Sequence, residues 1–309
     1  MPPVNRNQPI RAESSESRYS LMEFMREFPD DATCLEWLWR NRYSPDGVHA
    51  DCPKCGVERA FKRYQMKQQR QSWTCTACGE HLHPTAGTIF HKSSTSLHLW
   101  FYAMYLMTST RCGISAKQLE RELGVTYKTA WRIAHEIRHK LMNDDGEPLL
   151  GAVEIDHTYI GGKRRGMGRG YIDNKEAVFG AVEREGRVVA AHVGKTVRSA
   201  PNYRRIRKYV MPSTLVYTDE GWEFAKLRKR GYEHRRIRHN ENVYVSGDIH
   251  TNTVEGFWSI VKRGISGVYH AVSAKHLQDY LNEYAWRYNH RKDERAQFEE
   301  LLLRGTLPS

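Results

Sequence analysis

The chain has 309 residues and a formal charge of +12, because 48 Lys and Arg residues outnumber 36 Asp and Glu residues. This length suits about two folded domains with a sizeable core, and the basic balance favours a polyanionic partner, most often nucleic acid. No apolar run approaches the ~20 residues of a membrane span, and residues 1–18 lack the apolar core of a signal peptide, which argues against membrane and secreted proteins.

Residues 1–48 are predicted to hold a polar, disordered lead-in followed by helices. Apolar residues recur at helical spacing between Tyr19 and Tyr43, and Pro29 interrupts the pattern because proline cannot continue a helix. We therefore expect helical structure that breaks at Pro29.

Two CxxC pairs dominate residues 49–92, a segment of short, turn-rich stretches. In a cytoplasmic protein, which we expect here, cysteines are better interpreted as metal ligands or buried thiols than as disulfides. Residues 56–74 separate the two pairs, a spacing that fits a four-cysteine zinc site with a closed, structural shell. The sequence thus predicts a zinc ribbon whose Zn²⁺ ligands are Cys52, Cys55, Cys75 and Cys78.

Residues 93–146 are predicted to form a helical, DNA-binding region of the helix–turn–helix type. Leu119 and Leu123 face inward on the first helix, Gly124 supplies the turn, and Thr126 is a suitable N-cap for the second helix. A basic outer face on the second helix suits a DNA major groove, and its members are Lys128, Arg132, His135 and Arg138. A plain helical hairpin in a bundle is the alternative interpretation.

Residues 147–295 are predicted to form a mixed α/β domain. The pattern changes from helices to strands at Leu149, and the expected order is β-β-β-α-β-α-β-α. The expected strands are 152–160, 177–183, 187–193, 214–218 and 235–238. The expected helices are 199–209, 222–230, 252–262 and 273–291. Residues 296–309 are expected to be a C-terminal tail.

Three acidic residues occupy distinctive positions in this domain. Asp156 lies inside the first strand on the same face as Glu154, Asp219 ends the fourth strand, and Glu255 opens a helix. An acidic pair inside an apolar strand is costly unless it meets cations. Carboxylates from separate elements are the ligands that hold two Mg²⁺ ions for nucleotidyl transfer. Lys262 shares a helix face with Glu255 and is placed to hold a DNA phosphate.

Local alternatives exist for two of these acids. Asp219 could be a turn residue, and Asn252 with Glu255 could form a capping-box-like pair at the start of the helix. The joint occurrence of the acids with two DNA-binding signals favours a metal site. We predict Glu255 as the third ligand, because a carboxylate binds Mg²⁺ better than an amide, and Asn252 as the N-cap.

A glycine-rich basic loop covers residues 161–170. Its cations Lys163, Arg164 and Arg165 are predicted to clamp DNA phosphates. A solvated hairpin insertion is an equally good interpretation of the same residues.

From about Phe28 to Asn289, the chain resembles the DDE transposases of bacterial insertion sequences that carry an N-terminal zinc ribbon, the ISXO-like group. The resemblance rests on many motifs in a fixed order. They are Cys34-Leu-Glu-Trp-Leu, Cys52-Pro-Lys-Cys-Gly, Cys75-Thr-Ala-Cys-Gly, Ala86-Gly-Thr-Ile-Phe-His-Lys-Ser93, Leu123-Gly-Val, Lys128-Thr-Ala-Trp131, Val153-Glu-Ile-Asp-His-Thr-Tyr-Ile-Gly-Gly-Lys163, Thr218-Asp-Glu220, His250-Thr-Asn-Thr-Val-Glu-Gly-Phe-Trp-Ser259 and Arg287-Tyr-Asn289.

The resemblance implies a ribonuclease-H-like catalytic domain that depends on Mg²⁺ or Mn²⁺ and acts on the terminal inverted repeats of its element. By motif match, Asp156, Asp219 and Glu255 would bind the metal, and Lys262 matches the basic residue that follows the last acid. His157 is a departure, because the family commonly has Glu after the first Asp. We expect the His157 side chain to point to the opposite strand face, away from the metal.

The predicted function is therefore that of a DNA transposase, with metal-dependent strand cleavage followed by strand transfer. The predicted partners are double-stranded DNA, at the element ends and at the target, and a second copy of the chain. The predicted location is the nucleoid in a bacterial cytoplasm, with no membrane partner. A non-catalytic DNA-binding regulator and a nuclease of the same fold without strand transfer are the alternatives.

Overall fold

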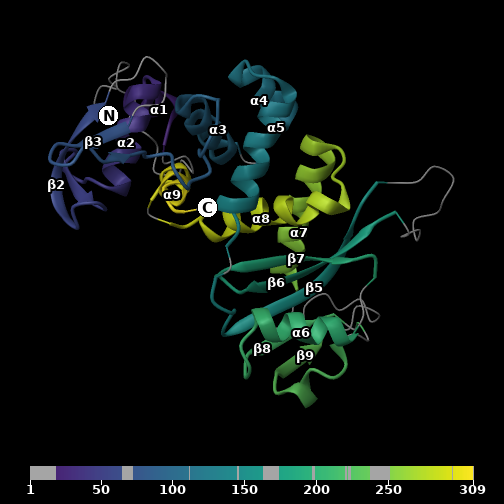
Figure 1. Cartoon of the computed structure of the whole chain (residues 1–309). Helices are drawn as coiled ribbons and strands as arrows, with labels where there is room; N and C mark the ends of the chain where they lie inside the picture. Colours follow the sequence, from purple (N-terminus) through teal and green to yellow (C-terminus); the bar gives the residue numbers. More distant parts are fainter. Residues whose placement is uncertain are drawn as a thin grey trace, which may run out of the picture. The chain divides into compact units, whose positions relative to one another are not determined.

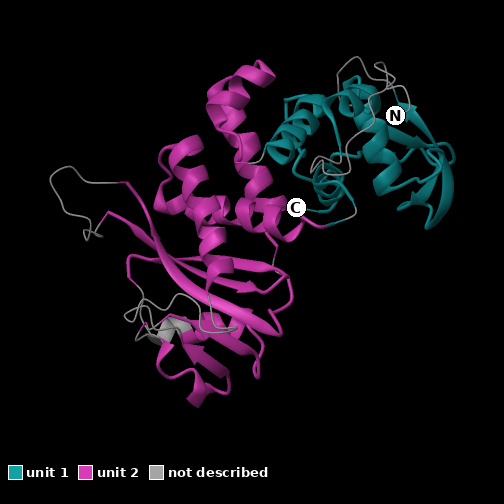
Figure 2. Cartoon of the chain, turned by 180° about the vertical axis from the view of Figure 1, so that it is seen from behind, with its two compact units in different colours: residues 1–110, 293–309 teal, residues 111–292 magenta. Residues whose placement is uncertain are grey.

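A computed structural model describes residues 19–64, 72–110, 112–144, 146–162, 174–196, 199–219, 221, 224–236, 251–293 and 295–308. The chain divides into two compact units (Figure 2). Unit 1 comprises residues 1–110 with 293–309, and unit 2 comprises residues 111–292. Within the described ranges, no helix has the length and apolar character needed to cross a membrane.

Unit 1 combines a small antiparallel sheet with four helices in its described part. The sheet has the strand order β1-β2-β3-β4. Its elements are α1 (Leu21–Glu27), α2 (Asp31–Arg42), β1 (His49–Cys52), β2 (Val57–Tyr64), β3 (Ser72–Cys75), β4 (His81–Leu82), α3 (Leu97–Ser109) and α9 (Gln297–Gly305). The predicted break at Pro29 is confirmed, because α1 and α2 end and begin on either side of it.

The start of each of these N-terminal helices is fixed by a side-chain cap. Ser20 and Glu23 form a capping box at α1, and the Asp30 carboxylate accepts a hydrogen bond of 2.8 Å from the Thr33 N–H at α2. Trp39 of α2 then stacks on Trp73 of β3 with 4.8 Å between ring centroids. Helix α2 therefore packs directly on the small sheet of unit 1.

The boundaries of the units differ from the predicted segments. Residues 93–146 do not stay together, because α3 belongs to unit 1 and the following helices belong to unit 2. The C-terminal tail contains helix α9, which packs against α3. The reason is that α3 is apolar on most of its surface and buries side chains against both α2 and α9.

Unit 2 is built on a mixed five-stranded sheet in the order β7-β6-β5-β8-β9 (Figure 1). Strands β5, β6 and β7 are antiparallel, whereas β8 and β9 run parallel to β5. The strands are β5 (Ala152–Ile160), β6 (Glu176–Glu183), β7 (Val188–Gly194), β8 (Leu215–Thr218) and β9 (Glu233–Arg236). The predicted mixed α/β class is confirmed.

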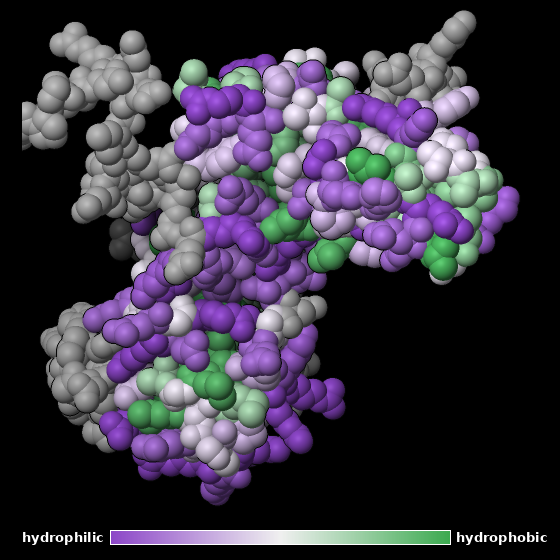
Figure 3. All heavy atoms as spheres, turned by 90° about the vertical axis from the view of Figure 1, so that its left-hand side faces the viewer, coloured by the Kyte–Doolittle hydropathy of each residue, from purple (hydrophilic) through white to green (hydrophobic). Residues whose placement is uncertain are grey.

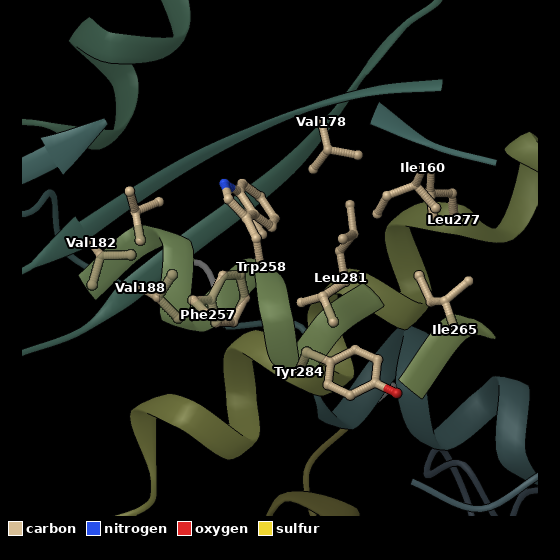
Figure 4. Packing of buried hydrophobic residues seen from close by; sticks show 13 residues of the cluster. Ile160, Val178, Val182, Val188, Phe257, Trp258, Ile265, Leu277, Leu281 and Tyr284 are labelled. Carbon is tan, nitrogen blue, oxygen red and sulfur yellow. The ribbon is translucent and has the colours of Figure 1, made fainter. Parts of the chain in front are cut away.

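Both faces of this sheet are covered, because alternate residues of each strand point in opposite directions. Val178 and Val182 pack against α7 (Asn252–Gly264) and α8 (Leu277–Asn289) on one face (Figure 4). Phe179 and Ala181 join the core under α6 (Ser199–Tyr209) on the other face. Gly180 faces α7, and a Cβ there would lie 2.3 Å from the Trp258 ring, so the close approach of α7 requires glycine.

The helix predicted for residues 222–230 is wrong where the structure describes it. Residues 224–230 form turns and the short 3₁₀ helix η3 (Arg228–Arg230), which ends at Gly231 with φ of +90°. Strand β9 consequently begins two residues earlier than the predicted strand at 235–238. The other predicted strands and helices of this domain differ from the observed ones only at their ends.

Two helices, α4 (Ala116–Leu123) and α5 (Tyr127–Glu136), precede the sheet of unit 2. Gly124 joins them in the left-handed conformation with φ of +63°, and Thr126 caps α5, as predicted. Helix α5 continues directly into the π-helix η1 (Ile137–Leu141), which packs against α8. Helix α7 is likewise extended by the π-helix η5 (Ile265–Tyr269).

The face of the molecule drawn in Figure 3 is mostly hydrophilic where the structure describes it. Apolar residues appear there in small groups between polar ones. This pattern fits a chain whose large apolar side chains are used in the cores of the two units.

Candidate active site

Asp156 and Asp219 meet at the centre of the unit 2 sheet. Strand β5 pairs in parallel with β8, and Ile155 lies opposite Thr218 in the register. Asp156 and Asp219 are the next residues along the two chains, so they leave neighbouring strands at the same level and on the same face. This face is the one that α7 covers, since Val153 and Ile155 belong to the core on the other side.

Glu255 reaches this neighbourhood from the first turn of α7, which packs against β5. Its carboxylate is exposed and accepts a hydrogen bond of 3.0 Å from the Thr251 hydroxyl. Lys262 lies two turns further along the same helix and is also exposed. The structure therefore brings three acids and one cation, predicted from separate motifs, to one region of the sheet.

The electrostatics of Asp156 report this proximity. Burial raises the pKa of its carboxyl group to about 7, and the negative charges of Asp219 and Glu255 add to the rise. The His157 N–H, which donates a hydrogen bond of 2.7 Å to Asp156 Oδ1, and the positive charge of Lys262 act in the opposite direction. The Asp156 carboxylate is desolvated and lies beside two further acids. A divalent cation bound there would offset the repulsion between their negative charges.

The three carboxylates do not converge as tightly as the ligands of a closed site. Asp156, Asp219 and Glu255 are not among the described groups whose ligand atoms all lie within 4.8 Å of one another. Three like charges repel one another, and oxygen-ligand sites for hard cations are larger and more open than thiolate sites. The donor set consists of carboxylate oxygens, which fits Mg²⁺ or Mn²⁺.

Glu154 has a role that the sequence did not reveal. It is fully buried and accepts hydrogen bonds from the backbone N–H groups of Thr253 and Val254, at 2.8 and 3.1 Å. The Thr253 hydroxyl and Arg184 Nε donate to the same carboxylate at 3.0 and 2.9 Å. Glu154 thus binds the free N–H groups at the start of α7 and attaches the Glu255-bearing helix to β5.

The predicted N-cap at Asn252 is wrong. The N-cap position is Thr251, its side chain makes no capping hydrogen bond, and Asn252 is an exposed residue inside the helix. The free N–H groups at the start of α7 are bound instead by the carboxylate of Glu154, which lies in a strand about 100 positions earlier in the chain. The one sequence signal for it was the acidic residue on the buried strand face, two positions before Asp156.

The expectation for His157 is confirmed. Its ring points to the opposite face of β5 from Asp156 and stacks on Phe224 with 5.2 Å between centroids and an interplanar angle of 23°. It also contacts Phe179, which belongs to the α6 side of the sheet. Histidine at this position therefore packs with the core and leaves the Asp156 face unchanged.

The predicted basic face of α5 is only partly present. Lys128 and Arg132 are exposed, but the His135 side chain is 26% exposed and turns towards Asp279. The prediction that Arg138 lies on the exposed face is wrong. This residue is 2% exposed, and its Nε donates a hydrogen bond of 2.6 Å to Glu283. The buried carboxylate of Glu283 offsets the cost of burying the Arg138 charge, which holds this side chain in the core instead of on the expected face. Lys163, Arg164 and Arg165 lie outside the described residues.

The four predicted zinc ligands come together in unit 1. Cys52 and Cys55 lie at the turn between β1 and β2, and Cys75 and Cys78 lie at the end of β3 and just after it. One sulfur atom from each is within 4.8 Å of the others, and Cys52 Sγ lies 3.5 Å from Cys78 Sγ. The cysteine cluster fits a zinc ribbon, with four thiols to complete a tetrahedral shell.

A family model and two known proteins are similar to this chain. Residues 148–289 match the model of the ISXO2-like transposase domain. A protein named "Uncharacterized protein in transposable element ISH50" from Halobacterium salinarum is 32% identical over 273 residues, which is 81% of this chain and 86% of the relative. An "Uncharacterized transposase-like protein" from Haemophilus influenzae is 29% identical over 113 residues, which is 36% of this chain and 89% of the relative. The chain belongs to the ISXO2-like transposase family.

Among solved structures, the one titled "Crystal structure of the Mos1 Strand Transfer Complex" matches with a TM-score of 0.24 and 11% identity. The match covers 62% of this chain and 76% of that one.

Proposed function

We propose that this protein is a DNA transposase of an insertion sequence, which binds the terminal inverted repeats of its element and catalyses metal-dependent cleavage and strand transfer. One observation carries the proposal: in a member of a transposase family, Asp156 lies half-buried with a raised pKa beside Asp219 and Glu255. Action on the element's own DNA would place the protein at the nucleoid in the cytoplasm.

The topology of unit 2 supports a ribonuclease-H-like catalytic domain. Three antiparallel strands are followed by two strands parallel to the first, with β5 at the centre of the sheet. The acids lie in the first strand, directly after the fourth, and on the helix that follows the fifth. This arrangement brings ligands from distant parts of the chain to one face, as a carboxylate-held metal site requires.

We assign the cation-binding role to Asp156, Asp219 and Glu255, with Mg²⁺ or Mn²⁺ as the ion. When bound, such ions supply activation of the attacking oxygen and stabilisation of the leaving oxygen. Asp156 must lose its proton to act as a ligand, and with a pKa of about 7 it is ionised only in part at neutral pH, so a bound cation would complete the loss of the proton. Lys262 is placed to hold a DNA phosphate on the same face of α7.

DNA recognition is assigned to three regions. The helix–turn–helix of α4 and α5 would present Lys128 and Arg132 to the duplex, the basic loop at Lys163–Arg165 would contact phosphates, and the ribbon would be held by a structural Zn²⁺ ion. We expect Arg132→Ala to weaken binding to the element ends and to reduce its salt dependence. A second copy of the chain is expected on the DNA, because two element ends must be joined to one target.

A cleavage assay tests the proposal. Labelled element ends are incubated with purified protein and Mg²⁺, and both nicked and joined products are measured. Glu255→Gln should abolish both products while DNA binding and folding stay close to wild type. Asn252→Ala, an exposed change on the same helix, is the matched control and should cleave normally.

The alternatives predict different products. Cleavage without any joined product would identify a nuclease of the same fold. A regulator would bind the ends and give no Mg²⁺-dependent product, and it is not favoured because it leaves the raised pKa of Asp156 beside two further acids unexplained. A folded, DNA-bound Glu255→Gln protein that cleaves at the wild-type rate would remove Glu255 from the site.

A further inference from the structure

A cluster of three histidines around one carboxylate lies in unit 2, away from the acids of the sheet. His135 is near the end of α5, His139 is in the π-helix η1, and His276 ends a 3₁₀ turn directly before α8. Asp279, in the first turn of α8, lies between them with 10% of its side chain exposed. The cluster joins segments that are about 140 residues apart in the chain.

The three histidines contact different oxygens of Asp279, with one at Oδ1 and two near Oδ2. His139 Nδ1 lies 2.8 Å from Oδ1, which is a normal hydrogen bond. His135 Nδ1 and His276 Nδ1 lie 3.4 and 3.7 Å from Oδ2, which is too long for a good hydrogen bond. These distances match the ~3.4 Å between neighbouring ligands of a tetrahedral ion with bonds of about 2.0–2.1 Å.

One donor atom from each of His135, His276 and Asp279 lies within 4.8 Å of the other two. In the described residues, only the four cysteines of the ribbon form another such group. The imidazole rings are also held in place by an aromatic neighbour. Trp131 stacks on His135 at 4.8 Å with an interplanar angle of 17°, and its edge contacts His276 at 5.1 Å.

A cavity lies beside the cluster and reaches it at His276. A cavity of about 450 Å³ is lined by residues that include Trp131, His276 and Tyr280. The helix also departs from regular α geometry here, because η1 places His139 next to Asp279 by a π turn, a distortion that is frequent at functional sites. Preformed donors, a fixed ring orientation and an entry path are what a metal site requires.

We propose that His135, His276 and Asp279 form a binding site for a transition-metal ion of the Zn²⁺ class. His139 holds the carboxylate through Oδ1, which leaves Oδ2 for the ion, in the way that ligating carboxylates are commonly oriented. Two imidazoles and one carboxylate select Zn²⁺, Co²⁺ or Ni²⁺ over Mg²⁺, so this site differs in chemistry from the acids of the sheet. A bound ion would fasten the end of α5, the helix that carries Lys128 and Arg132, to the start of α8.

Co²⁺ titration of the full-length protein tests the site. The protein is prepared with its cysteine site loaded with zinc and with Mg²⁺ in excess, so that neither the thiolates nor the acids of the sheet take up Co²⁺. We expect saturable binding, with Co²⁺ d–d absorption that lacks sulfur charge-transfer bands and with quenching of tryptophan fluorescence. Zn²⁺ added afterwards should displace the Co²⁺ signal.

Three variants define the ligands. His276→Gln and Asp279→Asn should each weaken Co²⁺ binding by about a hundred-fold, and His139→Gln by about ten-fold. His270→Gln, a change at an exposed histidine that lines the same cavity, is the control and should bind like wild type. Circular dichroism shows whether each variant is folded. If one of the ligand variants does not fold, His135→Gln is measured in its place.

The proposal is overturned by either of two results. Wild-type protein that shows no saturable Co²⁺ signal would leave the cluster as a hydrogen-bonded network without a metal. Variants His276→Gln and His135→Gln that are folded and bind Co²⁺ with wild-type affinity, or a spectrum with sulfur charge-transfer bands, would place the ion elsewhere.

Discussion

The two predicted metal sites of this chain are built in opposite ways. In unit 1, the four cysteines come from two pairs at the ends of neighbouring strands, and their sulfur atoms lie within 4.8 Å of one another. In unit 2, the acids lie in strand β5, directly after strand β8 and on helix α7. Two of them are half-buried and one is exposed, and they interact mainly through charge. The cysteine ligands are positioned by the hairpins that carry them. The acids lie on elements that are distant in the chain, so these elements must be attached to each other before the acids can meet.

Glu154 is the residue that meets this second need. It attaches the first turn of α7 to β5, two positions from Asp156, and so determines where Glu255 lies. In the ribbon, no such distant link is required between Cys52 and Cys55, because a tight turn ending in Gly56 joins β1 to β2. The comparison predicts that the two sites fail differently when single residues are changed.

The largest effect is expected for Cys75→Ser. Loss of one thiolate should release the zinc, and metal binding supplies on the order of 10 kcal/mol of folding free energy to such small sites. Hydrogen exchange should then show that β1–β4 unfold while the sheet of unit 2 stays protected. Cys112→Ser, at an exposed cysteine, is the control. Full zinc content in freshly reduced Cys75→Ser protein would contradict the ribbon.

Glu154→Gln should cause the next largest loss. The neutral side chain keeps the shape but turns an NH₂ group towards N–H donors and removes the negative charge that Arg184 Nε contacts. We expect the free energy of unfolding to fall by about 2–4 kcal/mol and cleavage to fall with it. Denaturant titration measures the first and the cleavage assay the second.

Glu255→Gln is the comparison variant for Glu154→Gln. It should abolish cleavage with little loss of stability, whereas Glu154→Gln should lower both. If Glu154→Gln unfolds at the wild-type denaturant concentration and also cleaves normally, α7 is positioned by its apolar contacts alone.

Asp156 should make the metal-free protein less stable as the pH rises. Its carboxyl pKa is about 7 in the folded protein and about 4 in the unfolded chain, so the folded state binds the proton more tightly between these values. Stability should therefore fall from about pH 4 to about pH 7 and then level off. Asp156→Asn should remove this fall and stabilise the metal-free protein at pH 8 by on the order of 2–4 kcal/mol.

Denaturant curves at pH 5 and pH 8 measure this effect, with and without Mg²⁺. The cation should stabilise wild type more at pH 8, where Asp156 is ionised, than at pH 5. An Asp156→Asn protein with the same pH dependence as wild type would show that another group is responsible.

The smallest effect is expected for Asn252→Ala. The side chain is exposed and does not cap α7, so the change should alter the free energy of unfolding by less than about 0.5 kcal/mol and leave cleavage intact. A loss near 1 kcal/mol, the usual value for a lost cap, would return Asn252 to the N-cap role.

Local patterns in the sequence were sufficient for much of this fold. The CxxC pairs, the turn at Gly124 with its cap at Thr126 and the alternation along β5 were predicted, and the structure has each of them. These features depend on residues within a few positions of one another, where backbone geometry leaves few choices. The positions of Asp156, Asp219 and Glu255 followed from the same strand and helix patterns.

Other features were decided only by the tertiary structure. Arg138 continued the basic face of α5 in the sequence, but it lies in the core, where it pairs with Glu283 of a distant helix. The residues after 296 read as a tail, yet they form α9 because α3 offers an apolar surface to cover. Glu154 caps a helix about 100 residues away. Each case depends on a partner that is remote in sequence, and helical or strand periodicity shows which face is apolar or charged but does not identify what packs against it.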